Sequence, residues 1–361
     1  MSTELETKLG TIRAALAAHD LGGVRLCGVD WFAWATCGGS SMVILSTETG
    51  VAEVLVTADH AWVLTDEIEA ARLKAEELPD GLEIWAAPWN APSRTARFVE
   101  QQLGGKPLAS DRPADNEVPL PAELVAAKRR LLTTEIDRYR ALGREAAEAM
   151  TEVLRRAEPD WTEFALAGAG ADAMWRRGIH PTLTLVGGAR RVPIYRHATA
   201  TAEPIGDRAM LVFCGRRHGL YANLTRFVYF RAPTADERRA IEEVATIEAA
   251  SFAASTPGAT VEDGYDAIVE AYARAGHSGA ERFHHQGGTC GYLSREVFGR
   301  PGVRTVIEAN TALAWNPSLP GAKIEDTVLT TTAGIEVLTA DPAWPTQTVA
   351  GLARPDVLVR T

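Results

Sequence analysis

The sequence predicts an α+β fold in two domains, a smaller α/β domain over residues 1–127 and a larger α+β domain over residues 128–361. Three observations support this prediction. The chain has 361 residues, more than one ordinary hydrophobic core holds. Short strand-like runs fill the first third, whereas long helices alternate with strands in the remainder. Pro113, Pro119 and Pro121 mark the boundary between the two patterns.

The first domain begins with a helix, because Leu9, Ile12, Leu16 and His19 recur at helical spacing. Polar and glycine-rich turns then separate short apolar runs, which predict strands. A loop enters a further helix near Ser93. The predicted strands cover residues 24–29, 42–45 and 51–56.

The second domain is expected to alternate two helices, two strands, two helices and further strands. Its first helix has a capping-box pattern at Thr134 and an apolar face between residues 136 and 153. This order predicts helices on one face of a largely antiparallel sheet. The other helices start at Pro159, Thr234 and Thr260, the first of them ending near Gly178, and the strands cover residues 209–213, 220–230, 312–314 and 323–331.

Composition excludes two classes of partner. The net charge is −10, and the chain has no long basic run, so a nucleic-acid partner is not expected. No apolar stretch is long enough for a membrane span, and the charged first twenty residues lack a signal-peptide core. We therefore expect a cytoplasmic protein. Its scattered cysteines are expected to be reduced thiols: Cys27, Cys37, Cys214 and Cys290.

Four blocks of sequence carry a resemblance. Arg196-His197 is followed by GDRAMLVFCGRRHGLYANLTRF from residue 206, by HHQGGTCGYLSRE from residue 284 and by AWNPSLPGAKIEDTVLTTTAGIEVLT from residue 314. In this order they resemble the motif blocks of the methionine aminopeptidase/creatinase superfamily. The resemblance implies a pita-bread C-terminal domain, a creatinase-like N-terminal α/β domain and a homodimer.

The chain departs from this superfamily at its metal site. Peptidases of the superfamily hold two divalent ions with two Asp, one His and two Glu. The corresponding positions here are Val212, Asn223, Gly288, Asn316 and Glu325. Val and Gly offer no ligand, and one carboxylate does not balance two dications. We therefore expect neither a metal nor another cofactor. Creatinase is itself metal-free and hydrolyses a guanidino C–N bond.

The resemblance places three candidate catalytic residues. His197 stands where creatinase has its catalytic histidine, and imidazole is the usual acid/base group at neutral pH. His284 and Glu325 would support it in one shared cavity. Each of the three has an alternative structural role, as a hydrogen-bonded core histidine or as a former ligand paired with Lys323. The candidate substrate-binding residues are Arg196, Asn223, His285, Arg295, Glu296, Asn316 and Lys323.

Other residues in the motif blocks favour structural roles. Arg226 is interpreted as an internal salt bridge, although an anion-binding role is the alternative. Cys214 and Cys290 are interpreted as small buried side chains and not as nucleophiles.

These observations predict a metal-independent, creatinase-like hydrolase that cleaves a C–N bond in a small polar metabolite by histidine acid/base catalysis. A lyase, isomerase or cyclase acting on a similar pocket is the alternative within enzymes. A second alternative is an inactive peptide-binding module, since a subunit of the histone chaperone FACT carries an inactive pita-bread domain. The third, a metallo-aminopeptidase, needs ligands that this sequence lacks.

Overall fold

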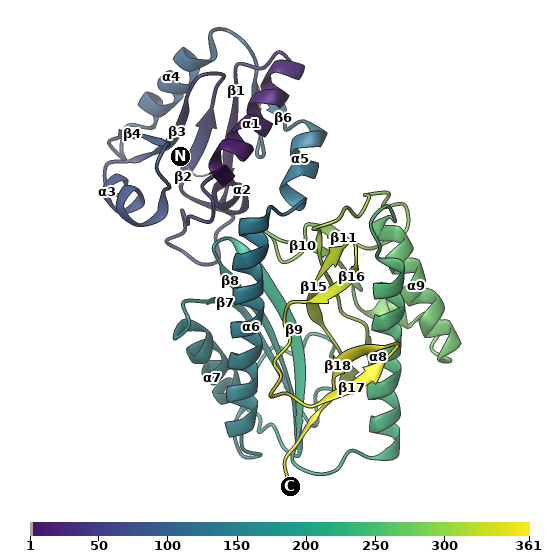
Figure 1. The fold of residues 1–361 in the computed structure, drawn as a ribbon. Helices are drawn as coiled ribbons and strands as arrows, with labels where there is room; N and C mark the ends of the chain where they lie inside the picture. Colours follow the sequence, from purple (N-terminus) through teal and green to yellow (C-terminus); the bar gives the residue numbers. More distant parts are fainter. Residues whose placement is uncertain (1–2) are drawn as a thin grey trace. The chain divides into compact units, whose positions relative to one another are not determined.

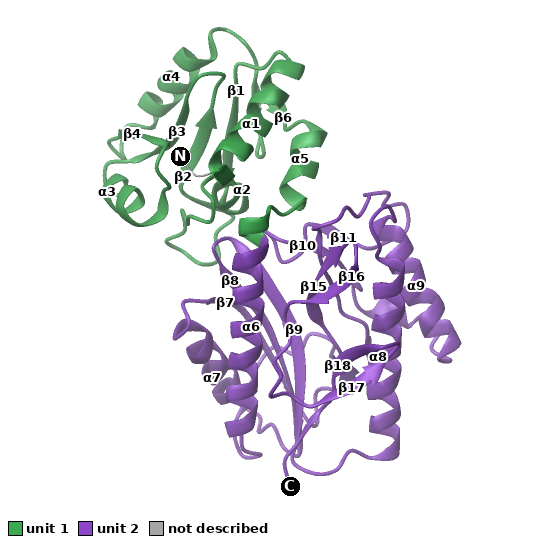
Figure 2. Cartoon of the chain, in the orientation of Figure 1, with its two compact units in different colours: residues 1–135 green, residues 136–361 purple. Residues whose placement is uncertain are grey.

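The computed structural model describes residues 3–361 and divides into two compact units, Met1–Glu135 and Ile136–Thr361 (Figure 2). The α+β class that the sequence predicts is confirmed. None of the helices within residues 3–361 has both the length and the apolar character that a membrane span requires.

The first unit is built on one six-stranded sheet with the order β4-β3-β2-β1-β5-β6. Its strands are β1 (Gly23–Gly28), β2 (Thr49–Val56), β3 (Ala61–Asp66), β4 (Glu83–Ala87), β5 (Leu108–Ser110) and β6 (Val118–Pro119). Its helices are α1 (Thr3–Ala18), α2 (Val29–Ala35), α3 (Ala70–Arg72), the π-helical turn η1 (Leu73–Glu77), α4 (Pro92–Leu103) and α5 (Ala122–Arg129).

The strand predicted over residues 42–45 is wrong. This segment is a loop in which Val43 and Ile44 are 61% and 66% exposed. A strand needs a hydrogen-bonding neighbour, and β1 already pairs with β2 on one side and β5 on the other. The segment therefore has no sheet edge beside β1 to join. The sequence also gave no signal for α2, whose seven residues are all buried.

The second unit opens with two helices, α6 (Thr133–Arg156, which begins in the last residues of the first unit) and α7 (Glu163–Trp175). Its other helices are α8 (Ala235–Ala254), α9 (Val261–Arg274) and the short 3₁₀ helix η2 (Ala280–Phe283). Its strands are β7 (His180–Gly188), β8 (Arg208–Arg217), β9 (Leu220–Tyr229), β10 (Gly287–Cys290), β11 (Val297–Phe298), β12 (Ala312–Trp315), β13 (Ser318–Leu319), β14 (Ala322–Lys323), β15 (Asp326–Thr331), β16 (Gly334–Val337), β17 (Thr346–Val349), β18 (Leu352–Pro355) and β19 (Leu358–Val359).

Two main sheets make up the second unit (Figure 1). One has the order β19-β9-β8-β7 and the other β11-β10-β12-β15-β16. They meet where the Thr225 N–H of β9 donates to the Glu325 carbonyl, at 3.0 Å, just before β15 begins. The sequence did not signal the first strand, β7, because a proline and two glycines interrupt its apolar pattern.

Local signals set most helix starts. The helix starts predicted at Thr234 and Thr260 are confirmed, and the structure shows a capping box at each: Thr234 pairs reciprocally with Glu237, and Thr260 with Asp263. The helix expected at Pro159 begins instead at Glu163, because Thr162 caps it by accepting from a backbone N–H. These caps fix the registers of the helices that cover the sheets.

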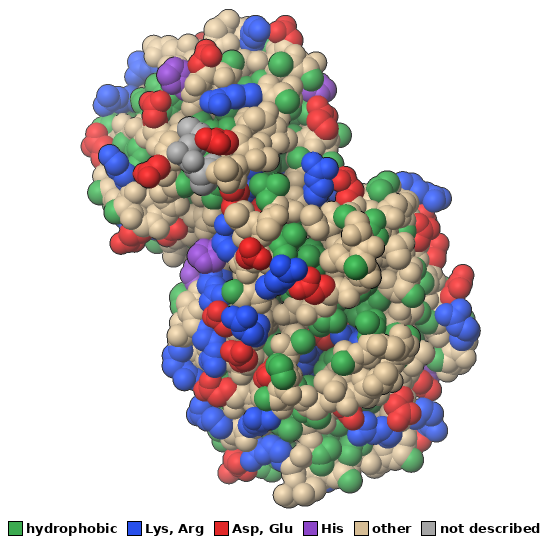
Figure 3. All heavy atoms as spheres, in the orientation of Figure 1, with side chains coloured by type: hydrophobic (Ala, Val, Ile, Leu, Met, Phe, Trp, Pro, Cys, Tyr) green, Lys and Arg blue, Asp and Glu red, His purple; other side chains and the backbone are tan. Residues whose placement is uncertain are grey.

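The core around the second sheet is made by α8 and α9, which lie side by side in Figure 1. Apolar residues of both helices enclose Trp315 of β12, which is fully buried. Gly264 of α9 allows this close approach, since an added Cβ would lie 2.5 Å from the Trp315 ring. On the face shown in Figure 3, acidic and basic side chains are interspersed over the surface.

Candidate functional site

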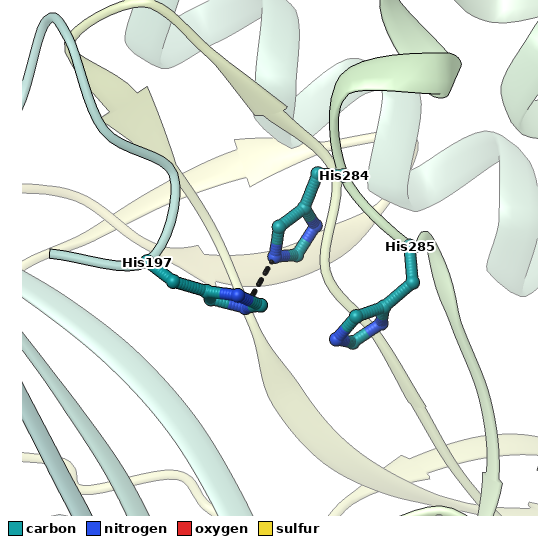
Figure 4. A group of neighbouring side chains, drawn as sticks. All are labelled: His197, His284 and His285. Atoms are coloured by element: carbon teal, nitrogen blue, oxygen red, sulfur yellow. Dashed lines mark hydrogen bonds between the residues drawn. The ribbon is translucent and has the colours of Figure 1, made fainter.

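Three histidines gather at one point of the second unit (Figure 4). His197 lies in the loop between β7 and β8, and His284 and His285 follow η2 directly. The Nε2 atoms of His197 and His284 are 2.8 Å apart. The rings of His284 and His285 stack with their centroids 4.5 Å apart. The chain thus brings together two predicted catalytic residues and one predicted substrate-binding residue.

All three imidazoles are held in the neutral form. Desolvation in the pocket, full at the buried His284 and partial at the more exposed His197 and His285, is the main cause that lowers the pKa of each ring. The Lys323 ammonium adds to this effect, and Glu325 opposes it at His197 and His285. The pKa of His285 falls to about 4, and that of His284 falls further. Neutral imidazole accepts protons and binds metal ions, whereas imidazolium does neither.

These histidines open onto a pocket of about 480 Å³. It is lined by Ile194, Tyr195, Arg196, His197, Phe283, His284 and His285. Tyr195 and Phe283 were not predicted as site residues, and their only signal in the sequence was their position next to predicted ones. Glu325, which was expected to share a cavity with His197, does not line this pocket, and neither does the substrate-binding candidate Arg295.

Arg196 is a half-buried cation in this pocket. Its burial lowers the pKa of the guanidinium. Within residues 3–361 no carboxylate forms an ion pair with it, and its Nε–H has no hydrogen-bond partner. A partly desolvated guanidinium without a counterion is disposed to bind an anion.

A second group, of buried charges, lies where the two sheets meet. The Glu325 carboxylate accepts from the Arg295 guanidinium and, at 3.1 Å, from the Thr225 hydroxyl. The Lys323 ammonium lies 3.8 Å from the same carboxylate. Nearby, Arg226 pairs with Asp326 at 2.7 Å, as its structural interpretation requires.

The donor set at the superfamily's metal positions does not fit a dinuclear centre. Val212 packs in an apolar cluster with Met210 and Phe227. The Glu325 carboxylate is paired with the Arg295 and Lys323 side chains. These two cations balance its negative charge, as metal ions would in a dinuclear centre. Only this residue of the five offers a carboxylate, and its two oxygens are already engaged.

Gly288 has no room for the ligand histidine of the superfamily. Its φ is +147°, and an added Cβ would lie 2.0 Å from the Val297 carbonyl oxygen of the neighbouring strand. Any side chain here requires β10 and β11 to move apart. The close pairing of these two strands therefore excludes the ligand physically.

We expect Gly288→Ala to lower the free energy of unfolding by about 1–3 kcal/mol, the usual cost of a strained backbone position. Gly291 is the matched control, because an added Cβ there meets only Glu296 Oε1 at 3.6 Å. Chemical denaturation of the two alanine variants checks the difference. Equal free energies of unfolding for the two variants would show that β11 moves at little cost and that a ligand side chain fits at position 288.

The remaining predicted residues fall into two groups. Asn223 and Asn316 are buried, and the Oδ1 atom of each has no hydrogen-bond partner within residues 3–361. Glu296 instead closes a turn, where its Oε1 accepts from the Leu293 N–H at 3.2 Å. Burial raises the pKa of Cys214 to about 12 and of Cys290 to about 11, which keeps both thiols protonated and poorly nucleophilic.

Comparisons with known proteins agree with this fold. Solved structures with the same architecture include the Xaa-Pro dipeptidase from Bacillus anthracis, at 18% identity and a TM-score of 0.78, covering 98% of this chain and 99% of that one. The X-Pro aminopeptidase from Thermotoga maritima has 16% identity and a TM-score of 0.78, with 97% and 99% covered.

A third similar structure is the N-terminal domain of FACT complex subunit SPT16 from Cicer arietinum, at 11% identity and a TM-score of 0.68, with 93% and 96% covered. No curated protein sequence matches the chain. The model of metallopeptidase family M24 matches residues 137–332, more than half of the chain. The superfamily resemblance is therefore confirmed, and this chain belongs to metallopeptidase family M24.

Proposed function

We propose that this chain is a hydrolase that cleaves a C–N bond in a small, carboxylate-bearing metabolite without the dinuclear metal centre of its family. One observation carries the proposal: the unpaired Arg196 guanidinium lies in the same pocket as the neutral, hydrogen-bonded pair of His197 and His284. An anion-binding group and an acid/base group thus face one ligand-sized space.

Arg196 binds the substrate carboxylate. Charge-assisted hydrogen bonds from guanidinium to carboxylate are frequently bidentate, and they orient the substrate as well as hold it. Because Arg196 lines the same pocket as the three histidines, a bound carboxylate places the rest of a small molecule beside the imidazoles. This geometry limits the substrate to a short span between its carboxylate and the scissile bond.

His197 transfers the proton. In its neutral form it takes a proton from water while the water oxygen attacks the carbon of the scissile bond. It then donates that proton to the leaving nitrogen, which departs with the electron pair of the C–N bond. The Nε2 of His284, at 2.8 Å, holds the His197 ring in one orientation between these two steps. Atoms and charge balance with water as the only co-reactant.

Glu325 acts through its neighbours. It neutralises Arg295 and Lys323, and it opposes their lowering of the His197 pKa. Its carboxylate therefore keeps the basicity of His197 closer to the range useful for proton transfer at neutral pH. We regard Glu325, Arg295 and Lys323 as positioning residues.

The test is a screen of guanidino, amidino, ureido and N-acyl amino acids with chelator-treated protein, measuring released ammonia or amine. For the substrate found, Arg196→Met should raise KM by about 10–100-fold with a smaller change in kcat, because a charged hydrogen bond is worth about 1.5–3 kcal/mol. Arg282→Met is the control, since that arginine lies on the neighbouring η2 and is largely exposed. Turnover that appears only after divalent ions are restored would contradict metal independence.

A second candidate function rests on the likeness to the SPT16 domain, which shows that this fold also occurs in a subunit of the FACT complex. On that alternative the pocket binds a ligand without reacting. The two candidates separate by mass spectrometry of an incubated ligand: binding of a carboxylate-bearing molecule that is recovered unchanged favours the non-catalytic alternative.

A further inference from the structure

We propose that His197, His284 and His285 form a binding site for a single transition-metal ion of the zinc class. This site is separate from the dinuclear centre of family M24, because none of its ligands occupies one of the five superfamily metal positions. The three side chains form the one histidine, cysteine or carboxylate cluster within residues 3–361 with the spacing of a metal site.

Geometry supports three imidazole ligands. One ligand atom from each ring lies within 4.8 Å of the other two. Zn–N bonds of about 2.0–2.1 Å place the nitrogens of a tetrahedral site about 3.3–3.4 Å apart. The 2.8 Å contact between His197 and His284 therefore opens slightly on binding, while His285 approaches. His197 and His285 are exposed and adjust easily, whereas His284 is 8% exposed and anchors the site.

In the bare histidine pair the two facing Nε2 atoms share a single hydrogen bond, in which one ring donates its N–H and the other accepts. A neutral imidazole has one N–H and one lone pair, so only one proton fits between the two facing Nε2 atoms. The buried Nδ1 of His284 has no partner within residues 3–361. A metal ion accepts both facing lone pairs at once, with both rings in the same tautomer.

The charges around the site define the ion and its remaining ligand. The histidines are neutral, and imidazole suits Zn²⁺, Ni²⁺, Cu²⁺ and Co²⁺ better than the hard cations Mg²⁺ and Ca²⁺. Arg196, Arg295 and Lys323 oppose a dication, and Glu325 favours one. We therefore expect a lower metal affinity than at a site with anionic ligands. The nearby cations favour an anion as the fourth ligand, bound on the open side of the pocket.

Under the proposed function the bound ion inhibits. The lone pair of His197 that would accept the proton from water is then donated to the metal. This consequence rests on the proposed acid/base role, whereas the existence of the site does not.

The test titrates metal-free protein with Co²⁺, whose visible absorption reports tetrahedral coordination, and then displaces it with Zn²⁺. We expect one ion per chain. His285→Ala and His197→Ala should each weaken binding at least about 10–100-fold, the loss that removal of even an outer-shell partner causes. His277→Ala is the matched control, since this histidine of the same unit pairs with Glu243 away from the site and should leave binding unchanged.

Absence of a tetrahedral band with wild-type protein, or equal binding by wild type and His285→Ala, would overturn the site. The effect of the ion on activity is measured separately, as the turnover rate at increasing metal occupancy of the site. A fall in turnover supports both proposals, whereas a rise would retain the metal site and remove the metal-independent function.

Discussion

Replacing His197 with alanine should lower kcat by at least about 10²-fold, because positioned acid/base groups contribute about 10²–10⁴-fold to rate. The melting temperature should barely change. The His197 side chain is exposed and sits in a loop, and within residues 3–361 its ring contacts are with the other two histidines of the pocket. Steady-state kinetics on the substrate of the screen, with a thermal scan of each variant, measures both quantities.

His277→Ala provides the control for removing an imidazole elsewhere in the same unit. Added free imidazole should restore part of the rate of His197→Ala, since the vacated space opens into the 480 Å³ pocket. A kcat within a few-fold of wild type would remove His197 from the chemistry. Such a result would favour the non-catalytic alternative for this fold.

Much of the fold was predictable from local signals. The capping boxes at Thr234 and Thr260 depend on residues three positions apart, so the sequence alone specifies them. The failure at residues 42–45 has a different cause. Whether a short apolar run becomes a strand depends on a free sheet edge, and distant segments decide that.

The site was also predictable only in part, because motif order in the sequence does not specify long-range contacts. Motif order placed His197, His284 and His285 in the chain, and the structure brings them together. It did not indicate that Arg295 would occupy the Glu325 carboxylate, because that contact joins residues 30 positions apart. Motif order also did not indicate that Arg196 would lack an ion-pair partner, because that depends on which side chains the fold brings around it.

Glu325→Gln should destabilise the second unit by about 3–5 kcal/mol, the usual cost of removing one partner of a buried ion pair. The substitution leaves the Arg295 and Lys323 cations buried without their counterion, in side chains that are 8% and 4% exposed. Each kcal/mol corresponds to about 2–4 °C in a domain of this size, so Tm should fall by about 6–20 °C. Chemical denaturation and calorimetry check this value without any substrate.

Glu336→Gln is the matched control, since that carboxylate of the same unit pairs with Arg140 at the surface, where removing an ion pair costs about 0–1 kcal/mol. Arg295→Met combined with Glu325→Gln should lose less stability than the sum of the single variants, by about 0.5–3 kcal/mol of coupling. Two results would show that the carboxylate does not stabilise the Arg295 and Lys323 cations. One is additive stability losses in the double variant, and the other is a Glu325→Gln variant as stable as the Glu336→Gln control. Glu325 would then be a former ligand with no remaining electrostatic role, and the argument that it maintains the basicity of His197 would fail with it.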